Sequence, residues 1–68
     1  MTPAPFKVNQ WVESDYRRPG YYQLVKVVAI EFRHKWAGQR FVIQVTPPLG
    51  SDKEGVWYST EFFRKAGQ

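Results

Sequence analysis

Three segments of the chain place aromatic rings beside cationic side chains. They are, in chain order, Tyr16-Arg17-Arg18 with Tyr21, Arg33-His34-Lys35-Trp36 with Arg40, and Phe63-Arg64-Lys65. Lysine and arginine can neutralise phosphates, and aromatic rings can stack on unpaired bases. Tyrosine, tryptophan and arginine also supply much of the binding energy at protein–protein interfaces. The residue types therefore predict a binding surface and leave both a protein and a nucleic acid open as its partner.

Nine residues are the candidates for this surface, whichever partner it binds. They are Tyr16, Arg17, Arg18, Tyr22, Arg33, Lys35, Trp36, Arg40 and Tyr58. Trp36 stands in a polar segment next to a cation, so it is the ring that we most readily expect to be exposed. The alternative is that this ring folds back over the end of the domain, since Trp is usually well buried. Tyr21, Tyr22 and Tyr58 are expected to be half exposed, because their polar tips favour interfaces.

The number of rings also favours exposure of some of them. The chain has 68 residues, and 18% of them are Phe, Trp or Tyr. A domain of this length buries only about 60% of the surface that its unfolded chain exposes. One small core cannot hold all of the rings, so we expect some to lie partly exposed beside positive charge. The marginal core also favours self-association as a source of stability.

The sequence contains no pattern that is typical of a catalytic or metal site. There is no Cys, and His34 is the only His, which excludes thiolate and His-rich metal sites. The six acidic residues are scattered, and no Gly-rich phosphate-binding motif is present. Nothing in the sequence brings the partners of a catalytic triad to His34. We therefore predict a protein without a cofactor and without enzymatic activity.

Net charge and hydropathy limit the kinds of partner and the cellular location that we expect for this protein. The formal net charge is +4, which favours an anionic partner but also serves solubility alone. The longest apolar-leaning run, residues 24–30, is interrupted by Lys26 and is far too short to span a membrane. Residues 1–5 (Met-Thr-Pro-Ala-Pro) have neither the basic nor the apolar part of a signal peptide. We expect a cytoplasmic protein without a membrane partner.

Proline content and alternation divide the N-terminal part of the chain. Residues 1–5 contain two prolines and are expected to form an extended arm, followed by a single domain over residues 6–68. The first strand is expected at residues 6–13. Trp11-Val12 breaks the alternation of this strand, which predicts a bend near Asn9-Gln10.

The strongest strand signal covers residues 21–33, after a loop at 15–20 that ends in Pro19-Gly20, a strong turn signal. Neither face of a straight strand would be purely apolar, which predicts a bend near residues 25–27. The bend would turn four side chains inward, Val25 before it, and Val28, Ile30 and Phe32 after it.

The C-terminal half is expected to continue with short elements. In order, they are a polar hairpin loop at 34–39, a strand at 40–46 that Pro47-Pro48 ends, a loop at 49–55 and a strand at 56–59. For residues 60–66 two readings are open. One is a helical turn capped by Ser59 or Thr60 and followed by a last short strand, and the other is a single two-turn helix. We favour the turn and strand, because so short a helix is marginal alone.

The expected strands predict which side chains form the core. The predicted core residues are Trp11, Val28, Ile30, Phe41, Ile43, Trp57 and Phe62. A chain of four or five short strands without a long helix must curl its sheet to bury one face. A small antiparallel β-barrel with a short helical turn near the C-terminus is the economical solution.

The spacing of three segments resembles that of SH3-like small β-barrels, including the Tudor and KOW types. Residues 6–12 look like the first strand, with Asn9 where those folds usually have Gly. Residues 21–32 look like the strand that crosses both sheets, and residues 57–63 like the closing strand, helical turn and final strand. The resemblance implies the fold class alone, because these barrels host many functions.

Two hypotheses about function compete. In the first, which we favour, the chain is a non-catalytic accessory or regulatory module for protein–protein interaction or self-association, because six acidic residues dilute its positive field. In the second, it is a nucleic-acid-binding module that uses the basic–aromatic surface. A small oligomeric enzyme is a third alternative, since type II dihydrofolate reductases are SH3-like barrels of similar length. Their Val-Gln-Ile-Tyr motif does not match residues 42–45, which read Val-Ile-Gln-Val.

Overall fold

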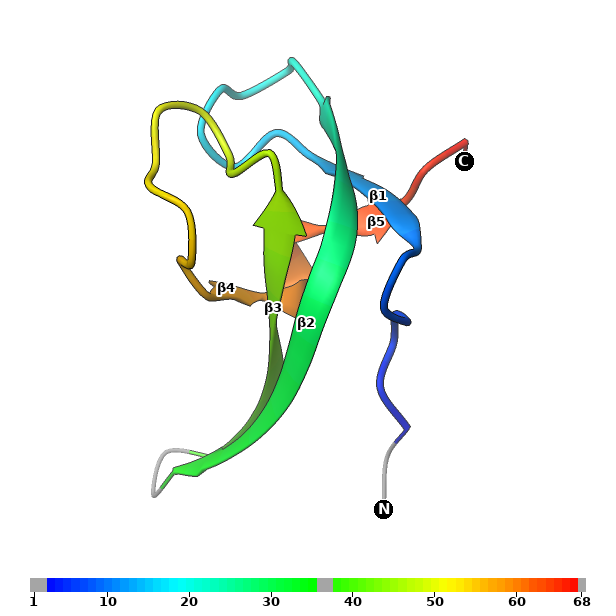
Figure 1. Ribbon diagram of the computed structural model, residues 1–68, viewed down its shortest axis with the longest axis vertical. Coiled ribbons are helices and arrows are strands. Elements are labelled where there is room, and N and C mark those ends of the chain that lie inside the picture. The colour runs from blue at the N-terminus through cyan, green and yellow to red at the C-terminus, as the bar shows by residue number, and fades with distance from the viewer. Residues whose placement is uncertain (1–2, 36–37, 68) are drawn as a thin grey trace.

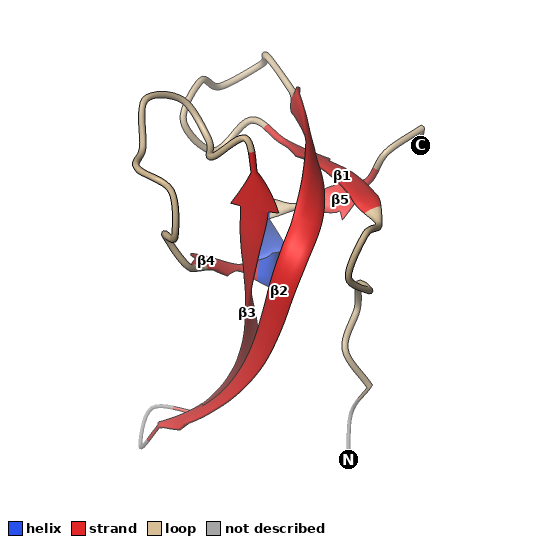
Figure 2. Cartoon of the chain, in the orientation of Figure 1, coloured by secondary structure: helices blue, strands red, loops and turns tan. Residues whose placement is uncertain are grey.

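The chain forms one antiparallel sheet of five strands (Figures 1 and 2). The computed structural model describes residues 3–35 and 38–67. The strands and the single 3-10 turn are β1 (Trp11–Ser14), β2 (Gln23–Lys35), β3 (Gly38–Thr46), β4 (Tyr58–Ser59), η1 (Thr60–Phe62) and β5 (Arg64–Lys65). Their order in the sheet is β4-β3-β2-β1-β5. The predicted all-β antiparallel fold with a helical turn near the C-terminus is therefore confirmed.

The predicted closure of the sheet into a barrel is wrong for the part of the chain that the structure describes. The two edge strands, β4 and β5, follow each other in the chain with η1 between them, and each has only two residues. Within the described ranges no pairing joins them, and the turn is closed instead by the bond from Phe63 N–H to the Thr60 carbonyl, at 3.1 Å. Ser59 stands at the N-cap of η1 but makes no side-chain capping bond, so the predicted cap is wrong too.

Strand β2 is long because it belongs to two regions of the sheet. Its first residues pair with β1, from Ser14↔Gln23 to Trp11↔Lys26, and its remainder pairs with β3 alone. The β2–β3 register shifts between Val27 and Ala29, so Val28 is bulged. The sequence predicted a bend at 25–27, and the bulge lies one residue further on. Bulges locally increase the twist of a strand.

The bend before β1 is where the sequence predicted it. Asn9 has a φ of 74°, a left-handed conformation that Asn tolerates better than most residues. Its N–H donates to the Val27 carbonyl at 2.7 Å, and Val27 N–H donates to the Gln10 carbonyl at 2.9 Å. Regular strand begins only at Trp11, and Phe6 lies buried in the core before the bend.

The core differs in part from the predicted one. Its buried members are Phe6, Val12, Val25, Val27, Ile43, Val45, Leu49, Tyr58 and Phe63. Of the predicted core residues, Ile43 is buried, and Ile30, Phe41 and Trp57 are half-buried. The others, Trp11, Val28 and Phe62, are exposed, as is Phe32, which was also expected to face inward. The register explains Trp11, since Val12 opposes Val25 on the inner face and leaves Trp11 beside Lys26 on the outer face.

The β2–β3 hairpin extends away from the rest of the molecule (Figure 1). The sequence predicted a loop at 34–39, but the ladder continues through His34↔Gln39 to Lys35↔Gly38. The prediction of an exposed Trp36 lies outside the described residues. No helix in the described part of the chain is long and apolar enough to cross a membrane.

Candidate binding surface

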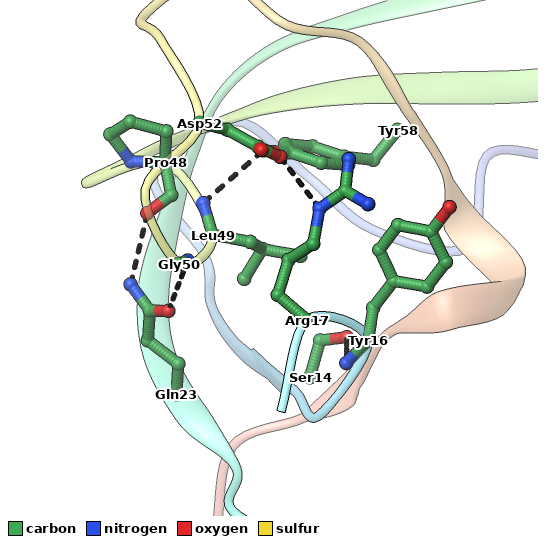
Figure 3. Close-up of polar contacts among 9 residues, drawn as sticks. All are labelled: Ser14, Tyr16, Arg17, Gln23, Pro48, Leu49, Gly50, Asp52 and Tyr58. Atoms are coloured by element: carbon green, nitrogen blue, oxygen red, sulfur yellow. Dashed lines mark hydrogen bonds and ion pairs between the residues drawn. The ribbon is translucent and has the colours of Figure 1, made fainter. Parts of the chain in front are cut away.

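Two loops at one end of the sheet are locked together by the side chain of Gln23 (Figure 3). Its Nε2 donates to the Pro48 carbonyl and its Oε1 accepts from Gly50 N–H, both at 3.0 Å. Gln23 begins β2, directly after the loop that follows β1, whereas Pro48 and Gly50 follow β3. Leu49, between the two bonded residues, is only 1% exposed. The loop after β3 is therefore anchored by a buried side chain and two backbone contacts.

The phenol of Tyr58 joins the same loop to the core. Tyr58 OH accepts from Leu49 N–H at 3.2 Å and donates to Asp52 Oδ2 at 2.6 Å. Arg17 Nε donates to that same carboxylate oxygen at 2.9 Å. The bond from Tyr58, followed by the bond from Arg17, lowers the pKa of Asp52 below its usual range. Burial, followed by the bond to Asp52, raises the pKa of Tyr58.

The loop between β1 and β2 carries an exposed ring that these contacts hold in place. Ser14, which is buried, accepts a hydrogen bond from Tyr16 N–H at 3.1 Å. The Tyr16 ring stacks on Phe62 of η1 with centroids 4.1 Å apart and planes at 24°. The Arg17 guanidinium lies 4.6 Å from the centre of the Tyr16 ring. Both stacked rings are exposed, Tyr16 at 41% and Phe62 at 38%.

Two further tyrosines of the same region are paired with arginines. The Arg64 guanidinium lies 3.6 Å from the centre of the Tyr22 ring, and its Nε donates to Glu13 Oε1 at 2.7 Å. Arg18 lies 4.2 Å from the centre of the Tyr21 ring. We call this cluster the Tyr–Arg surface and define it as Tyr16, Arg17, Arg18, Tyr21, Tyr22, Phe62 and Arg64.

The Tyr–Arg surface contains two depressions that share Tyr22 as a wall. One, of about 310 Å³, lies between the two loops and is lined by Arg17, Arg18, Tyr21 and Leu49 among others. The second, of about 320 Å³, is lined on one side by the stacked rings. Asp15 and Glu61 line this second depression. Both volumes lie at the lower end of the range for small-molecule sites.

The charges of the Tyr–Arg surface nearly cancel. Its three arginines are accompanied by four carboxylates, those of Glu13, Asp15, Asp52 and Glu61. The net charge of +4 must therefore come from other parts of the chain. One such part is the hairpin, where Arg33 and Arg40 are direct cross-strand partners and Glu31 contacts Arg33 at 3.3 Å.

The structure divides the nine predicted binding residues between several places. Tyr16, Arg17, Arg18 and Tyr22 lie together in the Tyr–Arg surface, whereas Arg33 and Arg40 lie on the hairpin. The prediction for Tyr58 is wrong: it is 4% exposed, because its ring lies in the core and its hydroxyl is satisfied internally. Lys35 is the last residue of β2, and its side chain lies outside the described part of the structure. The whole of Trp36 also lies outside it.

The nine predicted binding residues omit five that build or support this surface. Phe62 was assigned to the core, Tyr21 and Arg64 were named within the basic–aromatic segments but not among the nine, and Gln23 and Asp52 were not singled out. The sequence does contain one indication that Leu49 anchors its loop, because Leu49 is the only large apolar residue between Pro48 and Val56. The stacking partner of Tyr16 and the partner of Arg17 are distant in sequence, and no local pattern indicates either.

The described residues contain no group of three or more acidic or histidine side chains placed to hold a metal ion. Comparisons with protein-family models, with curated proteins and with solved structures found no significant match for this chain.

Proposed function

We propose that the chain is a non-catalytic binding module whose Tyr–Arg surface recognises a segment of another protein. The observation that carries the proposal is the stacked pair of exposed rings, Tyr16 on Phe62, set between Arg17 and the wall formed by Tyr22. Tyrosine and arginine are the residue types most enriched at interface hot spots. Rings already held by stacking and by loop anchors lose little conformational freedom on binding.

The balance of charge favours a protein partner over a nucleic acid at this surface. Binding to a phosphate backbone gains affinity from uncompensated cations, which release counterions. Here Arg17 and Arg64 already hold carboxylates at 2.9 and 2.7 Å, and two more carboxylates line the second depression. Such a mixed surface is suited to the mixed charges and apolar side chains of a polypeptide.

The proposal is tested by selecting displayed peptides on the immobilised protein and mapping the selected peptide by amide chemical shifts. We expect the shifts to change in residues 15–22 and 61–65. Phe62→Ala should weaken binding by about tenfold or more, the loss typical of a hot-spot ring. Phe32→Ala is the matched control, since Phe32 is similarly exposed, at 44%, but lies on the hairpin. Equal losses from both variants, or shifts confined to the hairpin, would contradict the proposal.

Nucleic-acid binding by the hairpin is a second candidate. It rests on the facing pair Arg33 and Arg40, since like charges directly opposite each other are unfavourable and, among the described residues, Glu31 contacts only Arg33, so an anion beside Arg40 would relieve the opposition. Oligonucleotide titrations followed by Trp fluorescence at about 50 and 200 mM salt test it. Arg40→Gln should then weaken binding, and Arg18→Gln should not. Binding that is insensitive to salt or to Arg40→Gln would rule this candidate out.

A further inference from the structure

Among the residues that the structure describes, no strand pairs with one edge of β2 over its second half. On that side the last contacts are the two backbone bonds of Val27 with Asn9 and Gln10. Beyond the bulge, residues 29–34 pair with β3 alone, and the described arm before Asn9 makes no backbone hydrogen bond to them. A row of unpaired N–H and C=O groups on such an edge is a template for another strand.

The same stretch of β2 carries one ring of an aromatic pair, and that ring is exposed. Phe32 and Phe41 are cross-strand neighbours with ring centroids 4.9 Å apart, and Phe32 is 44% exposed. They lie on the face that continues from Ile30↔Ile43, where Ile43 is fully buried. The face of the sheet that is buried at Ile43 therefore continues along the hairpin as an apolar face, and there it is partly exposed.

The charges along this edge are complementary to those of the same edge in a second, antiparallel copy. Glu31 and Arg33 flank Phe32 and point to the other face, with their side chains 49% and 33% exposed. Two copies of an antiparallel edge related by a two-fold axis at Phe32 would place Glu31 of each copy opposite Arg33 of the other. We propose that the chain forms a symmetric homodimer by pairing residues 30–34 of β2 edge to edge, with Phe32 opposite Phe32 of the second copy.

Three features favour this occupant and this register. Sliding one copy of the strand by two residues in either direction would place Glu31 opposite Glu31 or Arg33 opposite Arg33. Like charges directly opposite each other destabilise a pair of strands. The register at Phe32 forms two Glu–Arg pairs and joins the Phe32–Phe41 pairs of both copies into one row of rings. A two-fold interface is also the commonest closed arrangement of identical chains. The dimer uses a different part of the molecule from the Tyr–Arg surface and does not depend on it.

Charge reversal tests the register with the full-length chain. Sedimentation equilibrium at concentrations up to about 1 mM should show a monomer–dimer equilibrium for the wild type. Glu31→Arg and Arg33→Glu, made singly, each place like charges opposite one another twice, and each should weaken dimerisation by about tenfold or more. The double variant restores both pairs with their signs exchanged and should regain the wild-type equilibrium. Glu54→Arg, with the same change of charge in an exposed loop residue, is the matched control and should dimerise normally.

Mixing the two single variants separates the interface from effects on folding. Each variant alone should be largely monomeric, but an equimolar mixture should form a heterodimer, because every 31–33 pair then has opposite charges. A wild type that stays monomeric to about 1 mM overturns the proposal. So do single variants that dimerise like the wild type, and a mixture that stays monomeric while each variant melts as a folded protein.

Discussion

The Tyr–Arg surface and the β2–β3 hairpin look alike in the sequence but differ in the structure. Both combine rings with arginines, yet the rings of the first are braced by η1, by two locked loops and by ion pairs, whereas the second projects from the body with an unpaired edge. The first brings together residues far apart in the chain, whereas the second consists mainly of two adjacent strands, with Arg33 lying 5.3 Å from the centre of the Trp57 ring. A basic–aromatic composition therefore specifies neither the net charge nor the rigidity of a surface.

The largest expected effect is on the loop that supports the Tyr–Arg surface. Leu49→Ala should lower the free energy of unfolding by about 2–5 kcal/mol, because Leu49 is 1% exposed and its loss leaves a cavity. Leu24→Ala removes the same atoms from a residue that is 53% exposed, and it should change the free energy of unfolding by less than about 0.5 kcal/mol. Chemical denaturation of both variants measures the difference, and equal losses would show that Leu49 does not anchor the loop.

A smaller loss is expected when one oxygen atom is removed. Tyr58→Phe keeps the ring in the core but removes the acceptor of Leu49 N–H and one of the two donors to Asp52, which should cost about 1–3 kcal/mol. Tyr21→Phe, at a ring that is 64% exposed, is the control and should be close to neutral. If the two substitutions cost the same, water replaces the Tyr58 hydroxyl without loss and the bond network is not a structural anchor.

Truncation of single arginines should distinguish the two regions by the sign of the effect. Arg64→Ala loses a contact with Tyr22 at 3.6 Å and an ion pair with Glu13, and it should slightly lower the free energy of unfolding. Arg40→Ala relieves the opposition to Arg33 and should stabilise by up to about 0.5 kcal/mol. Thermal melts at low and high salt check both, since salt should reduce each effect.

The smallest effect is the pH dependence contributed by Asp52. Its pKa is lowered in the folded chain by the bonds from Tyr58 and Arg17, so the folded state binds its proton less readily than the unfolded chain does. The stability from Asp52 is therefore present above the ordinary Asp pKa and is lost as the pH falls through the lowered value. The difference in unfolding free energy between wild type and Asp52→Asn should shrink on acidification.

The matched control for the pH series is Glu54→Gln, which removes an exposed carboxylate from the same loop. It should show a much weaker dependence on pH over the same range. A constant difference between wild type and Asp52→Asn from neutral to acid pH would show that the carboxylate has the same pKa in both states.

Much of the fold could be predicted because its signals are local. Pro47-Pro48 ends β3 at Thr46, and the turn-and-strand reading of residues 60–66 is confirmed by η1 and β5. The predicted bend near Asn9-Gln10 is also present, with Asn9 in a left-handed conformation that Asn tolerates. The likeness to SH3-like barrels stays a prediction, as does the division into an arm at 1–5 and a domain at 6–68.

The candidate surface could be predicted only in part, because exposure depends on register. Exposed rings beside cations were predicted and are confirmed by Tyr16, Tyr21 and Tyr22, each with an arginine over its ring. Tyr58 and Phe62 were assigned the wrong way round, since both stand in one short segment of similar composition. The ladder places Tyr58 opposite Ile43 inside, and η1 then turns Phe62 outward onto Tyr16.

Local patterns in the sequence predict the strands, the turns and the presence of more rings than one small core can bury. These follow from alternation, from the backbone limits of Pro, Gly and Asn, and from chain length. The exposure of each ring and the pairing of each cation, as with Arg17 on Asp52 and Arg64 on Glu13, depend instead on contacts between distant segments. A one-residue bulge at Val28 and the pairing of distant loops set those contacts, and a side chain changes face whenever the register shifts by one residue.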